Sequence, residues 1–342
     1  MKSILPFKIK LARLRQQLSM DELVSRMGEH AVSKMSISKI ERGLLTPSET
    51  TLSAIAKACN VPVSFFSASE VSLSPICFRF EKDMPVKKAK MLEAELMLKI
   101  EECFTKEQMV TSATRYRNPL EGKVVRTYED AEDSASSLRK CLFIGTQPIH
   151  SVYEMLEELG VMVVEMDVDS KALLGTSTII NNVQPVVIIN TRSCTTTERK
   201  RFTALHELAH LMLDIQPVSE EEWQDESLKC PTIERLCHRF AGAMLISPSS
   251  LKRRLGEYRT ELSIKELISI RNMYGISIAA AVHRAHDLAI IPTATYDYLY
   301  DEHIKKNYME TGWGEYPIME KADRYDLLED RMILECGERK ME

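Results

Sequence analysis

The chain of 342 residues is too long for one ordinary domain and long enough for two or three domains with cores of their own. It has no run of about 18 apolar residues that would span a membrane and no apolar signal-peptide core at its start, so we expect a cytoplasmic protein without a membrane partner. Its eight scattered cysteines lack a Cys-x-x-Cys pair, which indicates reduced thiols rather than a disulfide framework.

Charge is divided unevenly along the chain. The first 69 residues contain ten Lys and Arg against five Asp and Glu, a balance of +5, whereas the whole chain carries a net charge of −5. The remaining residues therefore carry −10. A basic segment at the head of an acidic chain indicates that this segment meets a polyanion.

Capping residues and helical spacing predict a bundle of short helices over residues 7–59, interrupted at Gly28 and Gly43, in the order of a helix-turn-helix domain. In the third helix, Ile37 and Ile40 point to the core. Short polar or basic side chains of the same helix suit base edges and phosphates. These candidate DNA-contacting residues are Ser33, Lys34, Ser36, Ser38 and Lys39.

This segment resembles the Cro/repressor-like (XRE-type) DNA-binding domains through residues 37–43, Pro47 and residues 52–61. The resemblance implies double-stranded DNA as a partner. Two departures are visible: the turn before the third helix is about three residues longer than usual, and Met20 replaces a Gln that often contacts phosphate. The alternative is a small bundle that only binds protein or dimerises, because Lys and Arg often form a solvated face.

Residues 71–85 have the composition of a linker, and apolar residues at helical spacing predict a long amphipathic helix over 86–110. Simple packing is the favoured role of this helix, with a connector or the interface of a homodimer as alternatives. Farther on, a helix is expected over 152–159 and strands over 161–166, 175–180 and 186–190.

The last of these strands comes just before the helix expected over residues 201–214. An edge strand at such a place can pair with an extended peptide substrate through its backbone. The candidate substrate-binding residues are Val186, Val187, Ile188, Ile189 and Asn190. The equal alternative is that these strands only complete a sheet.

Residues 201–214 contain His-Glu-x-x-His within one amphipathic helix, for which Thr195 and Glu198 predict a capping box. His206 and His210 are four residues apart, so their imidazoles project from one helix face at a separation that one zinc ion can bridge. Glu207 lies beside them and is the candidate catalytic base, since a carboxylate there can take a proton from the attacking water.

A catalytic zinc site needs a third protein ligand, for which Glu234 is the best candidate. Glu234 opens an apolar-periodic segment, and a ligand on a packed helix is held better than one on a loop. Acidic residues of the loop before it stay open as alternatives: Asp214, Glu220, Glu221, Glu222, Asp225 and Glu226.

Residues 185–190, 201–210, 234–241 and 244–248 resemble the ImmA/IrrE family of zinc metallopeptidases, and the resemblance covers roughly residues 140–292. It implies a zincin-like fold, Zn²⁺ held by His206, His210 and Glu234, catalysis by Glu207, and cleavage of DNA-binding repressors. His238 departs from the Asn or Asp that is usual one turn after the third ligand, and it is a potential extra donor near the metal.

The helices expected after Pro248 place His283 and His286 among alanines, where packed or exposed roles are favoured over metal binding. We therefore expect an α+β protein in which an all-α helix-turn-helix bundle precedes a mixed metallopeptidase domain with a small sheet and the His-Glu-x-x-His helix. The expected parts are a DNA-binding domain (1–70), a linker and connector helix (71–139), the metallopeptidase domain (140–292) and an extension that covers the site or docks a partner (293–342).

The expected function is that of a DNA-binding regulator with zinc-dependent endopeptidase activity, which cleaves a repressor or antitoxin-like protein to control transcription. The alternative is a transcription regulator whose zinc domain is a sensor or a partner-binding module that does not cut. The intact Glu207 favours the enzyme, because a zinc sensor has no need of a carboxylate beside its two histidines.

Overall fold

The structure is a computed structural model of the whole chain. The residues that it describes are 5–16, 18–66, 86–108, 115–170, 173–223, 229–307, 313, 316, 319–325 and 327. The linker expected over 71–85 lies outside the described residues. The chain forms two compact units, the first made of residues 1–113, 179–183 and 323–342 and the second of residues 114–178 and 184–322.

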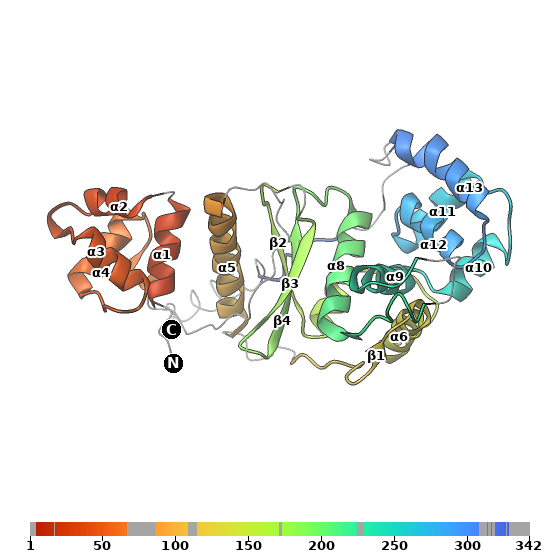
Figure 1. The fold of residues 1–342 in the computed structure, drawn as a ribbon, viewed down its shortest axis with the longest axis horizontal. Coiled ribbons are helices and arrows are strands. Elements are labelled where there is room, and N and C mark those ends of the chain that lie inside the picture. The colour runs from red at the N-terminus through yellow and green to blue at the C-terminus, as the bar shows by residue number, and fades with distance from the viewer. Residues whose placement is uncertain are drawn as a thin grey trace, which may run out of the picture. The chain divides into compact units, whose positions relative to one another are not determined.

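The first unit begins with a small helical bundle, visible at the red end of the chain in Figure 1. Its elements are α1 (Leu5–Arg15), α2 (Met20–Arg26), η1 (Gly28–His30), α3 (Lys34–Glu41), α4 (Glu49–Ala58) and η2 (Val63–Phe66). Ile9, Leu23, Ile37 and Ile55 are fully buried at its centre. The Ser19 hydroxyl caps the start of α2 by accepting from the Glu22 backbone, and the Glu22 side chain completes a capping box.

The predicted amphipathic helix is present as α5 (Val86–Gln108) and packs against α1. Leu96 and Ile100, two members of its apolar stripe, are fully buried. Beside them the Lys8 ammonium lies 2.8 Å from the Glu101 carboxylate, with both side chains buried. A packing role for this helix thus has direct support within the first unit.

A three-stranded sheet has the order β2–β4–β3, and all of it except residues 179 and 180 of β3 belongs to the second unit. β2 (Met162–Met166) and β4 (Gln184–Asn190) run parallel, with Met162 opposite Val186. β3 (Gly175–Ile180) joins β4 through Asn181 and Asn182, whose φ angles are +51° and +58°. Two successive positive φ angles form a type I′ hairpin turn, which Asn tolerates, so β3 and β4 are antiparallel.

Helices and two short strands complete this unit. In chain order they are β1 (Val124–Val125), α6 (Tyr128–Cys141), α7 (Val152–Glu158), α8 (Thr197–Met212), β5 (Asp214–Ile215), α9 (Ile233–Leu245), α10 (Pro248–Leu255), α11 (Ile264–Tyr274), α12 (Ile278–Asp287), α13 (Thr293–Leu299), η3 (Tyr300–Ile304) and η4 (Lys305–Asn307). α8 lies between the sheet and α9 and packs on both (Figure 1). The chain is thus α+β, with a small all-α bundle followed by a mixed domain, as predicted.

The strand order corrects one expectation about the sheet. Val186–Asn190 was expected to offer a free edge to substrate, but β4 is the central strand, paired with β2 on one side and β3 on the other. Val186, Val187, Ile188, Ile189 and Asn190 are all at most 1% exposed. Their role as substrate-pairing residues is therefore wrong, and β3 is the outer strand on that side of the described sheet.

Buried ion pairs connect separate elements of the second unit. The Arg284 guanidinium forms a bidentate pair with Glu132, at 2.8 and 2.9 Å, and so joins α12 to α6. From the C-terminal extension, Glu320 contacts Arg201 of α8, and the two side chains are completely buried. Among the described residues no helix is long and apolar enough to cross a membrane.

Candidate metal centre and DNA-binding face

Packing orients α8 so that its motif residues face away from the core. Leu205, Leu208 and Ala209 are fully buried, whereas His206 and His210 are partly exposed on the other side of the helix. This is the outcome expected for a helix with one apolar stripe, since positions four apart share a face.

The N-terminal cap of α8 differs from the prediction. Thr196 rather than Thr195 precedes the helix, and its hydroxyl accepts a hydrogen bond from the Arg199 backbone at 3.3 Å. Glu198 does not complete a capping box but lies 2.7 Å from the Arg271 guanidinium, with both side chains buried. A tertiary ion pair has therefore replaced the local bond that the sequence predicted.

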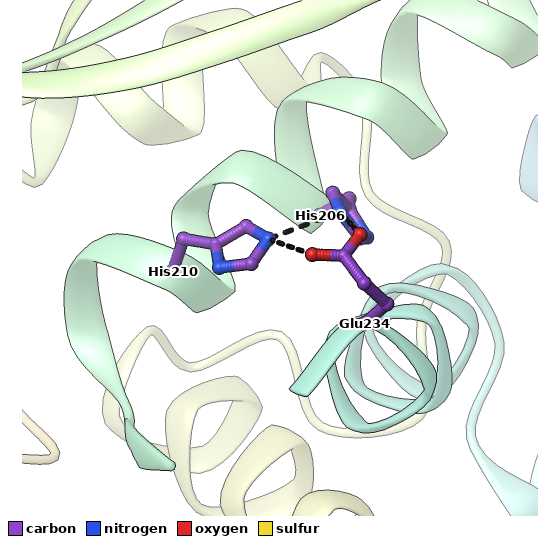
Figure 2. Close-up of side chains that lie close together, drawn as sticks. All are labelled: His206, His210 and Glu234. Carbon is purple, nitrogen blue, oxygen red and sulfur yellow. Dashed lines mark hydrogen bonds and ion pairs between the residues drawn. The ribbon is translucent and has the colours of Figure 1, made fainter. Parts of the chain in front are cut away.

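Figure 2 shows His206, His210 and Glu234 converging from α8 and α9. The Nε2 atoms of the two histidines are 3.2 Å apart, and the Glu234 carboxylate oxygens lie 3.4 Å from His206 and 3.5 Å from His210. A tetrahedral zinc ion with bonds of about 2.0–2.1 Å requires neighbouring ligand atoms to be about 3.3–3.4 Å apart. The two histidine nitrogens are near this spacing, and each has one of the Glu234 oxygens near it. One donor atom from each of the three residues lies within 4.8 Å of the others, so the group could hold a metal ion.

The element that carries Glu234 explains its position. Thr232 caps the start of α9, and Leu236 and Phe240 are buried, so that Glu234 in the first turn faces α8. Three turns of buried contacts thus fix a carboxylate that is itself partly exposed. The sequence argument that a ligand would come from a packed helix agrees with this geometry.

The loop acids that competed with Glu234 lie elsewhere or outside the described residues. Asp214, Glu220 and Glu221 are exposed, and Glu222 pairs with Arg126 at 3.0 Å. Asp225 and Glu226 are not among the described residues. In the described part of the chain, the one His, Cys, Asp and Glu group able to hold a metal ion is His206, His210 and Glu234.

The far side of His210 contacts Cys237 of α9. The Cys237 sulfur lies 3.6 Å from His210 Nδ1, and Cys237 is completely buried. Because Nδ1 faces this sulfur, Nε2 is the nitrogen directed toward His206 and Glu234. A contact of this kind fixes the ring orientation of a metal-binding histidine. Cys237 thus lies in the core beside the site and not among the clustered donor atoms.

Glu207 lies next to the donor cluster but is not part of it. Its carboxylate accepts a hydrogen bond of 2.8 Å from the Ser177 hydroxyl of β3. At Gly175, two residues earlier on this strand, a Cβ atom would lie 2.6 Å from the Thr203 methyl and 2.9 Å from the Ile188 carbonyl oxygen. Glycine therefore allows β3 to approach α8 closely. The sequence did not single out either Gly175 or Ser177.

His238 lies at the exposed side of the cluster. Its ring is 4.6 Å from that of His206 and stacks on Phe202 at 5.8 Å. The donor atoms that gather within 4.8 Å of one another do not include those of His238. His238 thus flanks the site, and the geometry favours a neighbour of His206 over an extra ligand.

The two downstream histidines contact aromatic and hydroxyl groups. His283 Nδ1 lies 3.0 Å from the Tyr296 hydroxyl, and desolvation lowers the pKa of His283 below its usual value. His286 Nε2 lies 3.2 Å from the Thr293 hydroxyl. His283 is exposed and His286 is half-buried, which agrees with the packed or exposed roles that the sequence favours.

Among the predicted DNA-contacting residues, the two serines at the start of α3 bond to each other, whereas both lysines are exposed. Ser33 caps the helix by accepting from the Ser36 backbone, and the two hydroxyls are 2.9 Å apart. Lys34 pairs with Asp21 at 2.6 Å, although both remain exposed. Ser38 is half-buried, and Lys39 is exposed. The serines at 33 and 36 therefore have a structural task that the sequence prediction did not include.

Two exposed residues on the outer side of α3 were missed. Met35 is 66% exposed, and Arg42 is exposed just after the helix. Together with Lys39 they follow one another at intervals of four and three residues, which places them on one face. The helical spacing from Lys39 was the signal that could have identified them.

Two family models match the chain. Residues 156–286 match a peptidase M78 model described as the IrrE N-terminal-like domain, and residues 9–66 match a helix-turn-helix model. The comparisons with curated proteins and with solved structures gave no significant match. The first match spans α8 and α9 with the whole donor cluster, and the second spans α1 to η2. The two resemblances drawn from the sequence are thereby confirmed: a peptidase-family domain follows a helix-turn-helix domain.

Proposed function

We propose that the chain is a cytoplasmic DNA-binding regulator whose second unit is a zinc-dependent endopeptidase, and that it cleaves a repressor or antitoxin-like protein to control transcription. One observation carries this proposal: donor atoms of two histidines and a glutamate gather within 4.8 Å of one another, beside the Glu207 carboxylate, which is not one of them. Three protein ligands leave the fourth position of zinc open, as catalytic rather than structural sites require.

His206, His210 and Glu234 would hold the ion. When bound, zinc supplies a Lewis acid that polarises a carbonyl group and makes water more acidic. The partly exposed carboxylate of Glu207 accepts the proton of the attacking water as general base and returns it to the departing amine. His210 offers Nε2 as its donor atom because its Nδ1 faces Cys237.

The peptide would bind along β3 rather than β4. β3 is the outer strand of the described sheet beside α8, and its Gly175 and Ser177 lie against the motif helix. An extended peptide that adds to this strand would pass the catalytic carboxylate, with its backbone groups supplying binding. This placement replaces the substrate strand inferred from the sequence.

The helix-turn-helix domain would bind duplex DNA through α3. Lys39 and Arg42 supply positive charge to the phosphates, and the exposed Met35 suits apolar contact with a thymine methyl group. Proteins of this class commonly read two half-sites as dimers, so a homodimer on the operator is part of the proposal.

Zinc binding gives the first expected result. The wild-type chain should contain about one zinc per chain, and Glu234→Ala should lose most of it, because two histidines alone bind zinc more weakly than three ligands. Metal analysis of purified protein measures this. Glu222→Ala is the matched control and should retain zinc. Full occupancy in Glu234→Ala together with loss in Glu222→Ala would assign the third ligand to the loop.

The second expected result concerns DNA binding. Affinity for duplex DNA from the chain's own promoter should fall steeply with salt, and Lys39→Ala should reduce the slope of log K against log salt by about 0.9 for one lost phosphate contact. Lys57→Ala removes an exposed lysine of α4 and is the control, with an unchanged slope. Equal slopes for the wild type and both variants would show that α3 does not contact DNA phosphates through Lys39.

The proposed function is tested by expressing the chain together with the products of its neighbouring genes. A neighbouring regulator that is cleaved only when the intact chain is present, and that remains whole after zinc is chelated, supports the proposal. Intact neighbours in the presence of zinc-loaded protein, with unchanged DNA binding, would favour a regulator whose zinc domain acts without cutting.

A further inference from the structure

We propose that Ser177 is a positioning residue for Glu207: its hydroxyl holds the catalytic carboxylate beside the zinc-binding atoms and links it to the strand on which the peptide binds. This inference rests on the proposed peptidase function. It adds a residue that acts on the reaction through Glu207.

The hydrogen bond has a defined direction. An ionised carboxylate can only accept, so the Ser177 hydroxyl must be the donor in the 2.8 Å contact with Glu207 Oε2. Glu207 is partly exposed and has three rotatable side-chain bonds, which without a partner would sample several rotamers. A hydrogen bond to a charged group is among the stronger ones, and it selects one of these orientations.

The backbone of β3 makes this contact possible. Side chains alternate along a strand, so Gly175 and Ser177 lie on the same face of β3. At Gly175 that face is so close to α8 that a Cβ atom would come within 2.6 Å of Thr203 and 3.4 Å of Glu207 Cγ. Because residue 175 has no side chain, the strand lies near enough for the short Ser177 side chain to reach the carboxylate.

The position of Ser177 also connects binding with catalysis. A peptide paired with β3 is bound by the same strand that orients Glu207. The strand therefore fixes the position of the scissile bond relative to the Glu207 carboxylate. Catalytic groups must be held to within about 0.5 Å of their working geometry, which a strand achieves better than a loop. Ser177 therefore contributes to the rate through the base and not through affinity for the metal.

The test uses zinc-loaded full-length protein and acetohydroxamate, a small metal chelator whose acidic proton a neighbouring carboxylate can accept. Ser177→Ala should keep its zinc and bind acetohydroxamate about tenfold to a hundredfold more weakly, the loss expected for one hydrogen bond to a charged group. Ser137→Ala, a half-buried serine of α6, is the matched control and should bind as the wild type does.

A second pair of variants separates the hydroxyl from side-chain shape. Ser177→Thr and Ser177→Val have the same shape and both suit a strand, but only Thr retains the donor. Near-wild-type affinity in Ser177→Thr and weak affinity in Ser177→Val support the proposal. Equal affinities in this pair, or wild-type affinity in Ser177→Ala, overturn it. A wild-type chain that holds no zinc overturns the peptidase function itself, and this inference with it.

Discussion

Glu207→Gln is expected to slow cleavage of the protein substrate by about a hundredfold to ten-thousandfold while zinc content and DNA affinity stay at wild-type values. Gln has the same size as Glu and can still accept from Ser177, but it cannot take a proton from water. Glu207 lies outside the group formed by His206, His210 and Glu234, so its replacement leaves every zinc ligand in place. Cleavage rates at equal enzyme and zinc concentrations measure the effect.

Glu222→Gln is the matched control for this variant. Glu222 is an exposed loop acid that pairs with Arg126, and its replacement should leave the cleavage rate unchanged. A Glu207→Gln protein that cleaves as fast as the wild type would contradict the general-base role. Loss of zinc in Glu207→Gln would instead contradict the assignment of Glu207 as a residue that does not bind the metal.

Glu320→Ala should lower the free energy of unfolding of the second unit by about 3–5 kcal/mol, because it leaves Arg201 buried without its charge partner. Both side chains are completely buried. The Glu320 carboxylate also accepts from the Ser151 hydroxyl at 2.9 Å and from the backbone of Val152 and Tyr153 at 2.8 and 3.1 Å. One alanine substitution therefore removes the acceptor for a buried arginine and for the first turn of α7.

The lost stability should affect α8, which carries the site. Arg201 is five residues before His206 on this helix, and it packs against Gly275, where a Cβ atom would lie 2.5 Å from its Nε. Chemical denaturation of zinc-loaded protein measures the loss. Glu257→Ala, which removes an exposed partner of Lys252, is the control and should cost at most about 1 kcal/mol. A cost that small for Glu320→Ala would mean that the extension does not stabilise α8.

The features that the sequence predicted well are local ones. The His-Glu-x-x-His helix and the helix with Glu234 follow from spacing within a few residues. The strand over 162–166 was predicted from its short apolar run. The strand over 175–180 was also predicted, and the short turn that follows it makes it the hairpin partner of β4. For these elements, periodicity and capping residues contain the needed information.

The corrections to the sheet and to the role of Glu198 depend on contacts between distant segments. β2 comes before β3 in the chain but pairs on the far side of β4, which buried the strand expected to bind substrate. Glu198 pairs with Arg271, more than 70 residues away, instead of capping its own helix. Ser177 and Glu320 were missed for the same reason, since nothing near them in the sequence indicates their partners Glu207 and Arg201.

The central claim, that this zinc site cuts a regulator, is tested most directly by mapping new protein N-termini in cells that produce either the wild type or Glu207→Gln. The two proteins must first be shown to have equal abundance and equal zinc content. The account predicts a new N-terminus within a repressor or antitoxin-like protein in wild-type cells and its absence in the variant. Identical sets of N-termini in the two strains, with transcription regulated equally in both, would contradict it.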